Sequence, residues 1–433
     1  MKRVVFYLIL VFSLSPVFLS AKAVHPKVEK VVYELEKNNF SKVHSLFSKN
    51  FKKRVKEESV KELWSTFIQM YGDFESIGKS YKKPNGKYFD YLTILKFKEG
   101  LASMRITLNQ EEEVVGFQLD QAGERKPEYE FIDSKSIFEK EITFNSKGTD
   151  LSGTLTLPKK TGKFPLVVFV HDLGPLNRNS TIGRCDFFKD FAHRMAEYGI
   201  ACFRYDKRNF IYGQGQINNF DEEIVDDAVA ALQQMESVSE IDKNKIFVAA
   251  HGVGGMFAAR IGQNYGKLKG LVLLAPAVRP LYDVAYSQIR YIANLDGKMS
   301  DAEQARLLQM KKSMKIVANL NEESNPKERV LLFPNSYWLN MQNYDAVGEA
   351  KKLNVPIMVA WGDRDYKTTD VDFNIWDFNL KDYKAGATLK KYPYLNHLFV
   401  RGRMPSSPAE YCSSGNVFVT PIDDISYWII RNM

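Results

Sequence analysis

The stretch FVAAHGVGGMFAARIG at residues 247–262 has the layout of a turn that presents a catalytic side chain. An apolar run is followed by a tight turn of small residues and then by a helical pattern. In many acyl-transfer enzymes such a strand–turn–helix holds a serine nucleophile at a strained backbone position. Ala250, Gly254 and Gly255 are the small neighbours that the crowded turn requires, yet Gly252 stands at its tip. The sequence therefore predicts an acyl-transfer scaffold without the hydroxyl that attacks.

Two later segments contain the residue types that would assist a nucleophile. Residues 361–365 read WGDRD after an apolar run, and they offer the carboxylates of Asp363 and Asp365. Residues 394–399 read YLNHLF and place His397 after the last strand of the pattern. A carboxylate that orients a histidine, and a histidine that takes a proton, form the general-base pair of acyl transfer. The chain order is thus nucleophile position, acid, histidine.

The hydrophobic pattern of the first part of the chain is typical of a small α+β domain. From Val28 to Tyr71 the apolar residues recur at spacings of three and four, which predicts amphipathic helices. Between Lys79 and Leu119 short runs alternate apolar and polar residues around turns, which predicts antiparallel strands. We assign this α+β domain to residues 24–130.

Residues 131–433 alternate strand with helix. A hairpin is predicted over IFEKEITF and LSGTLTLP, and buried strands such as FPLVVFV and KIFVAA follow between helices. Strands that are apolar on both faces indicate a doubly wound, mainly parallel sheet, so the fold class is α/β. A helical insertion at about residues 279–350 follows the sixth strand. There it would cap the carboxyl ends of the strands, where such sheets bind ligands.

Five blocks of the second part occur in a fixed order. They are HDLGPLNRNSTIG after the third strand, YDKRNFIYGQG after the fourth, AAHGVGG after the fifth, WGDRD after the seventh and YLNHLF after the eighth. With these blocks the chain resembles the α/β-hydrolase superfamily, close to its serine esterase and serine aminopeptidase-like branch. The stretch NNFSKVHSLFSKNFKKRV and the later LWSTFIQMYGDFESIG are similar to an NTF2-like domain of unknown function. That domain precedes some exported bacterial members of the branch.

The resemblance implies hydrolysis of an ester, or less readily an amide, of a small acyl substrate. Its pattern places the acid at Asp365 rather than Asp363, and the base at His397. The N–H groups of Val253 and Leu173 would form the oxyanion hole. This chemistry needs no cofactor, and the sequence has no spacing typical of metal ligands, so we expect neither.

Other residues of these blocks receive structural interpretations. His171 and His251 flank the expected pocket, and we interpret both as packing or turn residues. The block Arg204-Tyr205-Asp206-Lys207-Arg208 has the pattern of a strand end with a charged turn, and Asn209 follows it where the family pattern continues with glycine. Because asparagine tolerates positive φ, we expect the turn to be kept. We interpret this block as a structural brace of the floor of the site rather than as a catalytic element.

Gly252 decides what activity can be expected. Glycine adopts positive φ without steric cost, whereas another residue pays on the order of 1–3 kcal/mol. The glycine therefore keeps the turn and removes the attacking atom, which predicts a degenerate or very slow hydrolase, a possible pseudoenzyme. Alternatives are a water that His397 activates in the vacated space, Cys185 as a substitute nucleophile, and a non-catalytic module that binds an acyl or peptide-like ligand or another protein.

The first residues predict export. Lys2 and Arg3 precede the apolar run Val4–Phe12, and Ala21-Lys22-Ala23 offers small residues to a signal peptidase. We therefore interpret residues 1–23 as a secretory signal peptide of a periplasmic or secreted protein. No later run approaches the ~20 apolar residues of a membrane span, so none is expected after cleavage.

Charge and cysteine content point to no special partner. The formal net charge of the 433 residues is +8, but the segment from Val24 to Asp133 holds 19 Lys and Arg against 18 Asp and Glu. This balance argues against nucleic acid as a partner. Cys202 lies in an apolar strand and is expected to be buried, whereas a disulfide between Cys185 and Cys412 is left open. The oligomeric state cannot be inferred.

Overall fold

The structure is a computed structural model that describes residues 24–85, 88–98, 100–121, 137–183, 185–213, 217–331, 333–402, 405–412 and 415–433. The chain divides into two compact units, residues 1–124 and 125–433. The expected signal peptide and the expected boundary after residue 130 lie outside the described residues. Among the described residues, no helix is both long enough and apolar enough to cross a membrane.

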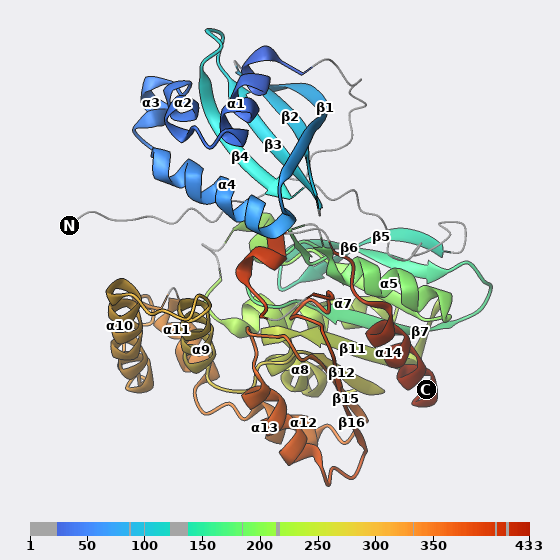
Figure 1. The fold of residues 1–433 in the computed structure, drawn as a ribbon. Coiled ribbons are helices and arrows are strands. Elements are labelled where there is room, and N and C mark those ends of the chain that lie inside the picture. The colour runs from blue at the N-terminus through green and yellow to red at the C-terminus, as the bar shows by residue number, and fades with distance from the viewer. Residues whose placement is uncertain are drawn as a thin grey trace. The chain divides into compact units, whose positions relative to one another are not determined.

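The first unit is the predicted small α+β domain (Figure 1). Its helices are α1 (Pro26–Glu36), α2 (Phe40–Ser45), α3 (Lys49–Lys52) and α4 (Glu57–Tyr71), and its strands are β1 (Phe74–Asn85), β2 (Tyr88–Phe97), β3 (Gly100–Leu108) and β4 (Val114–Gln121). The four strands form one antiparallel sheet in sequence order. The apolar stripes of the helices pack on this sheet, with Val31, Leu35, Leu95 and Met104 in a core of its own.

The second unit is built on an eight-stranded sheet of order β16-β15-β12-β11-β7-β10-β6-β5. In chain order the strands are β5 (Ile137–Ser146), β6 (Thr149–Pro158), β7 (Phe164–Val170), β10 (Ala201–Tyr205), β11 (Ile241–His251), β12 (Gly270–Leu274), β15 (Ile357–Gly362) and β16 (Ala387–Tyr392). The β5–β6 and β6–β10 pairs are antiparallel, and the other pairs are parallel. The predicted hairpin and the predicted doubly wound sheet are both confirmed.

Helices cover both faces of this sheet because alternate strand residues face opposite sides. On β7, Val167 and Phe169 belong to the core under α5 (Phe187–Glu197) and α14 (Val419–Arg431). Leu166 and Val168 belong to the core on the other face. That face is covered by α7 (Asp226–Met235), α8 (Gly252–Tyr265), α12 (Ala346–Lys352) and α13 (Asp370–Leu380).

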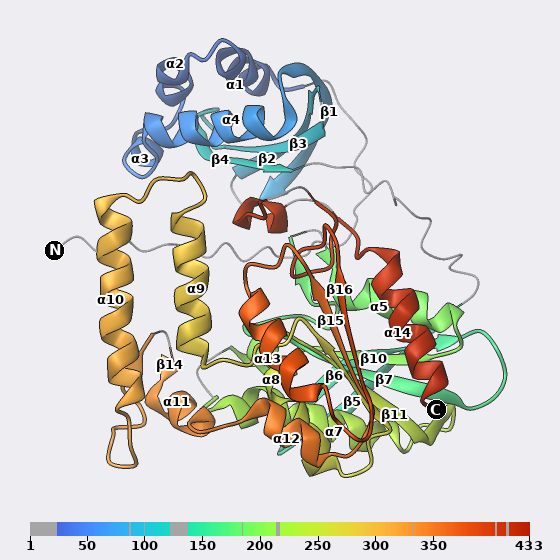
Figure 2. The same cartoon turned by 60° about the horizontal axis from the view of Figure 1, so that its bottom comes forward.

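Further helices lie between β12 and β15, in the predicted insertion. They are α9 (Leu281–Ala293), α10 (Asp301–Ala318) and α11 (Asn335–Met341), and β13 (Arg329–Val330) pairs with β14 (Phe333–Pro334) between the last two. Figure 2 shows α9 and α10 side by side as two long helices. The remaining short elements are β8 (Thr181–Ile182), β9 (Cys185–Asp186), α6 (Arg208–Tyr212), a π-helical turn (Asp221–Val225) and a 3-10 helix (Pro408–Cys412).

Candidate active site

The register of two neighbouring strands places Asp172 opposite Gly252. In the parallel pair of β7 and β11, Val170 lies beside Ala250, and each chain continues two residues further to Asp172 and Gly252. Gly252 begins α8 with a φ of +54°. This is the left-handed conformation that glycine adopts without strain. The predicted strand–turn–helix is therefore present, and a carboxylate faces its tip.

The carboxylate of Asp172 fills the space that a side chain at position 252 would need. A Cβ placed on Gly252 would lie 2.2 Å from Oδ1 and 2.4 Å from Cγ of Asp172. Oδ1 also accepts a hydrogen bond of 2.8 Å from the backbone N–H of Val253, the donor expected to bind an oxyanion. The space in which an activated water was one alternative is thus occupied by the chain itself.

His397 lies against this carboxylate and is held by Asp365. Nδ1 of His397 lies 2.6 Å from Oδ2 of Asp365, and its Nε2 lies 3.4 Å from Oδ2 of Asp172. Oδ1 of Asp365 accepts the backbone N–H groups of Lys367 and Thr368, which fixes the carboxylate. The structure therefore brings Asp172, His397 and Asp365 into one row, and the catalytic roles of Asp365 and His397 stay predictions.

The side chain of Asp363, the alternative acid, binds the backbone of the loop after β16. Its Oδ1 accepts the backbone N–H of Tyr394 at 2.7 Å.

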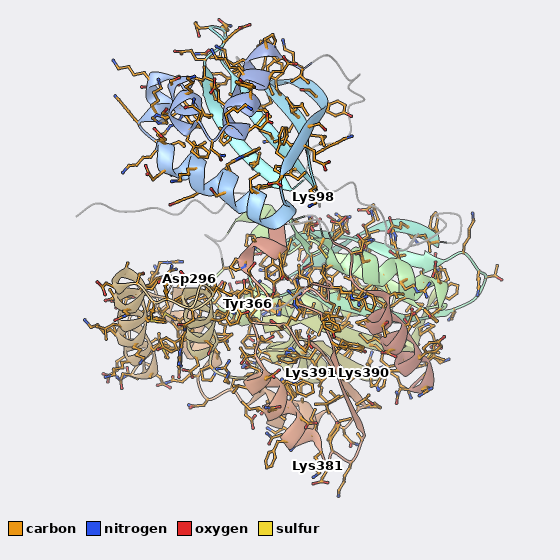
Figure 3. All side chains as sticks on the ribbon, in the orientation of Figure 1. Lys98, Asp296, Tyr366, Lys381, Lys390 and Lys391 are labelled. Carbon is orange, nitrogen blue, oxygen red and sulfur yellow. The ribbon has the colours of Figure 1, made fainter. Side chains whose placement is uncertain are left out.

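The loop after β15 also contacts the insertion. The neighbouring Tyr366, labelled in Figure 3, stacks on Tyr291 of α9 with ring centroids 4.9 Å apart. The loop after β15 therefore joins the insertion to the row of Asp172, His397 and Asp365.

Asp172 and His397 stabilise each other as an ion pair. Burial by itself would raise the pKa of Asp172, but the hydrogen bond and charge of His397 outweigh it and hold that pKa well below its usual range. Burial would likewise lower the pKa of His397, but the charge of Asp365 and the hydrogen bond with Asp172 raise it above 6.5. Asp172 is thus ionised near neutral pH.

The two flanking histidines are buried and donate hydrogen bonds to backbone carbonyl oxygens near the site. Nε2 of the fully buried His251 lies 3.0 Å from the carbonyl oxygen of His397, and Nε2 of His171 lies 3.0 Å from that of Asn177. A carbonyl only accepts, so both rings donate there. Burial lowers the pKa of each ring to about 3, so both are neutral at pH 7. Their packing roles agree with the sequence interpretation.

A buried lysine holds the loop that carries Asp172. Nζ of Lys207 donates to the carbonyl oxygen of Asp172 at 3.0 Å and to Oε1 of Glu223 at 2.8 Å. Glu223 also accepts a hydrogen bond of 3.1 Å from the hydroxyl of Tyr337 in α11. Lys207 and Glu223 are each only 2% exposed. This chain of hydrogen bonds links the insertion to the backbone of Asp172.

Asn209 corrects one expectation. It lies inside α6 rather than in a positive-φ turn, and its amide donates to Glu223 at 3.0 Å. Lys207, from the block interpreted as a brace, and the side chain of Asn209 both donate to Glu223. Sequence reasoning missed Glu223 and the role of Asp172. The signal for Asp172 was a charged residue directly after the third strand, beside the expected oxyanion donor Leu173.

The small residues of the turn are required by packing. A Cβ on Gly254 would lie 2.3 Å from the carbonyl oxygen of His171, and one on Gly255 would lie 2.7 Å from Cβ of Pro276. Such separations are shorter than van der Waals contact, so α8 approaches its neighbours too closely for alanine. Leu173 is half-buried and packs against the core on the α8 face.

The cysteine expectations are met in part. Cys202 is fully buried, and burial raises the pKa of its thiol. Cys185 is buried as well, which disfavours its use as a substitute nucleophile. The side chain of Cys412 lies outside the described residues, so the pairing of Cys185 with Cys412 stays open, as it was from the sequence.

Two cavities lie beside the insertion. One of about 310 Å³ lies between α8 and the insertion and is lined by Met256, Tyr282, Trp338 and Tyr344 among others. The second, of about 450 Å³, is lined by residues of α9 together with Thr369 and Pro405. Both are within the size range of small-molecule sites.

One group of described residues could hold a metal ion. Asp172, His251 and His397 each offer one ligand atom, and these atoms lie within 4.8 Å of one another. Such a set of two imidazoles and one carboxylate suits zinc or iron. Binding would have to displace the ion pair of Asp172 with His397. We had expected no metal, because no local spacing links residues so far apart in the sequence.

Two family profiles and one curated relative match the chain. The profile described as serine aminopeptidase, S33 matches residues 181–397, about half of the chain. The profile of a protein family of unknown function, DUF3887, matches residues 28–117. Esterase EstD of Thermotoga maritima is 32% identical over 407 residues, which cover 92% of this chain and 94% of that protein.

Solved structures of esterases are also similar. Est1E from Butyrivibrio proteoclasticus is 16% identical with a TM-score of 0.43, over 67% of this chain and 98% of that chain. The hyperthermophilic esterase from Pyrobaculum calidifontis is 17% identical with a TM-score of 0.46, over 68% and 84% of the two chains.

Proposed function

Since the chain belongs to the serine aminopeptidase S33 family of α/β-hydrolases, we propose that it descends from serine esterases and has lost serine-type ester hydrolysis. The observation that carries the proposal is the carboxylate of Asp172 at the place of the nucleophile. Gly252 lacks the attacking hydroxyl, and Asp172 takes its space and accepts the Val253 N–H. An ester carbonyl therefore finds neither a serine nor an empty donor at that position.

A small ester-like ligand and an extracytoplasmic location complete the proposal. The resemblance to Esterase EstD supports a small ester, or its carboxylate product, as the ligand class. The sequence Ala21-Lys22-Ala23 after an apolar run supports export, and amino-terminal sequencing of the secreted protein would test it. Mature chains that begin at Val24 are expected.

A second candidate function is ligand binding without reaction. The cavity of about 310 Å³ between α8 and the insertion supports it, because Tyr282, Trp338 and Tyr344 line that cavity with aromatic surface. A small apolar acyl group would fit this lining. A change in tryptophan fluorescence on titration with short fatty acids that is absent in Trp338→Phe would report such binding, because the chain has five tryptophans.

The loss of serine chemistry is tested with three variants and the unchanged protein. Gly252→Ser, Asp172→Gly, the double variant Asp172→Gly/Gly252→Ser, and the unchanged chain are assayed with nitrophenyl acetate and butyrate and with a fluorophosphonate label. We expect only the double variant to be labelled and to turn over. In Gly252→Ser alone, the Asp172 carboxylate still competes for the space beside the serine and for the Val253 N–H that an oxyanion would need.

The matched control adds His397→Ala to the double variant. Its activity should fall by a factor on the order of 10⁴–10⁶, the loss seen when one member of a serine triad is removed. Ester hydrolysis by the unchanged chain at a rate that depends on His397 would refute the proposal. An inactive, unlabelled but folded double variant would show instead that more than Gly252 and Asp172 separates the site from a working serine hydrolase.

A further inference from the structure

We propose that Asp172 is a nucleophile that displaces an anionic leaving group from a saturated carbon, and that His397 activates the water that releases the product. The inference rests on the proposed loss of serine chemistry, because it gives the carboxylate in the serine's place a reaction of its own. It begins from the position of the two carboxylate oxygens.

The carboxylate of Asp172 is placed as an attacking group. Its Oδ1 is bound to the backbone N–H of Val253 at 2.8 Å, whereas Oδ2 faces Nε2 of His397 at 3.4 Å. A carboxylate that is ionised and held by fixed donors is a competent nucleophile. The Asp172 side chain keeps 12% of its surface exposed while that of His397 keeps 1%, so a small substrate reaches the carboxylate first.

The chemistry of the leaving group selects a saturated carbon. Attack of a carboxylate on an ordinary ester carbonyl would have to expel an alkoxide, which is a far stronger base than the carboxylate, so the intermediate would revert. Attack on a saturated carbon expels a weakly basic anion and gives a stable alkyl ester. Lys367 is near enough for its positive charge to lower the pKa of Asp172, and the same charge favours departure of an anion.

The reaction balances in two steps. In the first, Oδ2 of Asp172 forms a bond to carbon, and the bond from carbon to the leaving group breaks with its electron pair on the departing anion. In the second, His397 first releases its proton to solvent, and water then attacks Cγ of the ester and gives one proton to Nε2 of His397. The negative charge develops on Oδ1, which already accepts the Val253 N–H. Collapse expels the alkoxide, which takes this proton from His397 and leaves as the alcohol. The proton that remains on the Asp172 carboxyl group passes to His397 and restores the ion pair, so the net products are the alcohol, the anion and one proton.

The charges of the site suit this order of events. Before attack, the hydrogen bond with Asp172 and the charge of Asp365 keep the pKa of His397 above 6.5. Alkylation removes the charge of Asp172, so the pKa of His397 falls and the ring becomes a better base. Asp365 still holds Nδ1 at 2.6 Å and keeps Nε2 directed at the ester.

The first test is release of bromide from 1-bromopropane by the purified full-length protein, with and without EDTA. The controls are Asp172→Asn, nearly equal in volume, and His397→Gln, each checked for folding by circular dichroism and thermal melting. We expect bromide release by the unchanged chain, a loss of at least 100-fold in Asp172→Asn, and one stoichiometric burst in His397→Gln. Mass spectrometry should find a propyl group on the Asp172 peptide of His397→Gln.

Isotope labelling tests the two steps directly. In a single turnover in water enriched in ¹⁸O, the label should enter Asp172, and the propanol should keep unlabelled oxygen from the carboxylate. Label in the alcohol of the first turnover would mean direct attack by water and would overturn the proposal. Absence of both bromide release and adduct would overturn it too, and so would full loss of release in EDTA, which would indicate a metal-bound hydroxide.

Failure of this inference is distinguishable from failure of the proposed function. Bromide release reports the carboxylate chemistry of the unchanged chain. Ester turnover by Asp172→Gly/Gly252→Ser reports the serine chemistry that was lost. Either result can hold without the other.

Discussion

The positions of Asp172 and Gly252 depend on each other, because the Asp172 carboxylate lies in the space that a larger residue at position 252 would need. The carboxylate occupies the position of a side chain at residue 252, and it is neutralised by His397. A substitution at either position therefore alters the electrostatics of the whole row. The two histidines that flank the site, His251 and His171, are buried and neutral at pH 7, because burial lowers the pKa of each to about 3.

These buried histidines predict loss of stability in acid. Between pH 6.5 and 3 the unfolded chain binds protons at His251 that the folded chain does not, so the free energy of unfolding falls as the pH falls. We expect His251→Gln to be less stable at pH 7 but to show a shallower decline, by up to about 1.4 kcal/mol per pH unit. Urea titrations at several pH values measure this. Equal slopes for the two proteins would contradict it.

At the scale of elements, most of the secondary structure of the second unit could be predicted from the sequence. The eight strands and their mainly parallel order followed from apolar runs between helices. Asp365 and His397 came from the family pattern that the chain resembles, and the structure brings them to 2.6 Å from each other. The role of Asp172 was missed because it depends on which strands are neighbours. Only the adjacency of β7 and β11, the third and fifth strands of this sheet in chain order, brings Asp172 to Gly252. Lys207 was interpreted as part of a brace, but its partner Glu223 was missed because an acidic residue in a helical segment usually lies in solvent.

The close approach of α8 predicts which glycines are essential. Gly254→Ala would press a Cβ against the carbonyl oxygen of His171 and should destabilise the protein by about 3 kcal/mol. Gly262→Ala in the same helix would meet only the flexible ends of Leu268 and Leu353, with a gain in helix propensity of about 1 kcal/mol in its favour. Chemical denaturation of both variants measures the difference. A tolerated Gly254→Ala would contradict the packing.

The buried pair of Lys207 and Glu223 predicts coupling between the insertion and the site. Lys207→Met leaves Glu223 buried without its cation and should cost about 3–5 kcal/mol. The double variant Lys207→Met/Glu223→Gln should recover part of this loss, because it removes both charges. Denaturation of the two single variants and the double variant forms the cycle. Additive effects would show that the pair is not coupled.

At the scale of the whole molecule, two cores predict two unfolding transitions. Among the described residues, the buried core of the first unit runs from Val28 to Leu119, and the cores of the second unit begin at Phe144. Met104→Ala should shift one calorimetric transition and Leu232→Ala the other, each by a destabilisation of about 2–5 kcal/mol. A single transition that both variants shift would show that the units unfold together.

The carboxylate at the tip of the turn also constrains the history of the chain. A serine at position 252 would overlap the Asp172 carboxylate in its present position, so an ancestor that held both residues needed the Asp172 side chain turned away from the Val253 N–H. The carboxylate could take its present position only once the hydroxyl was lost. On the return path, the carboxylate must leave the Val253 N–H before that group can bind an oxyanion. Laboratory evolution toward esterase activity should therefore change position 172 as well as position 252.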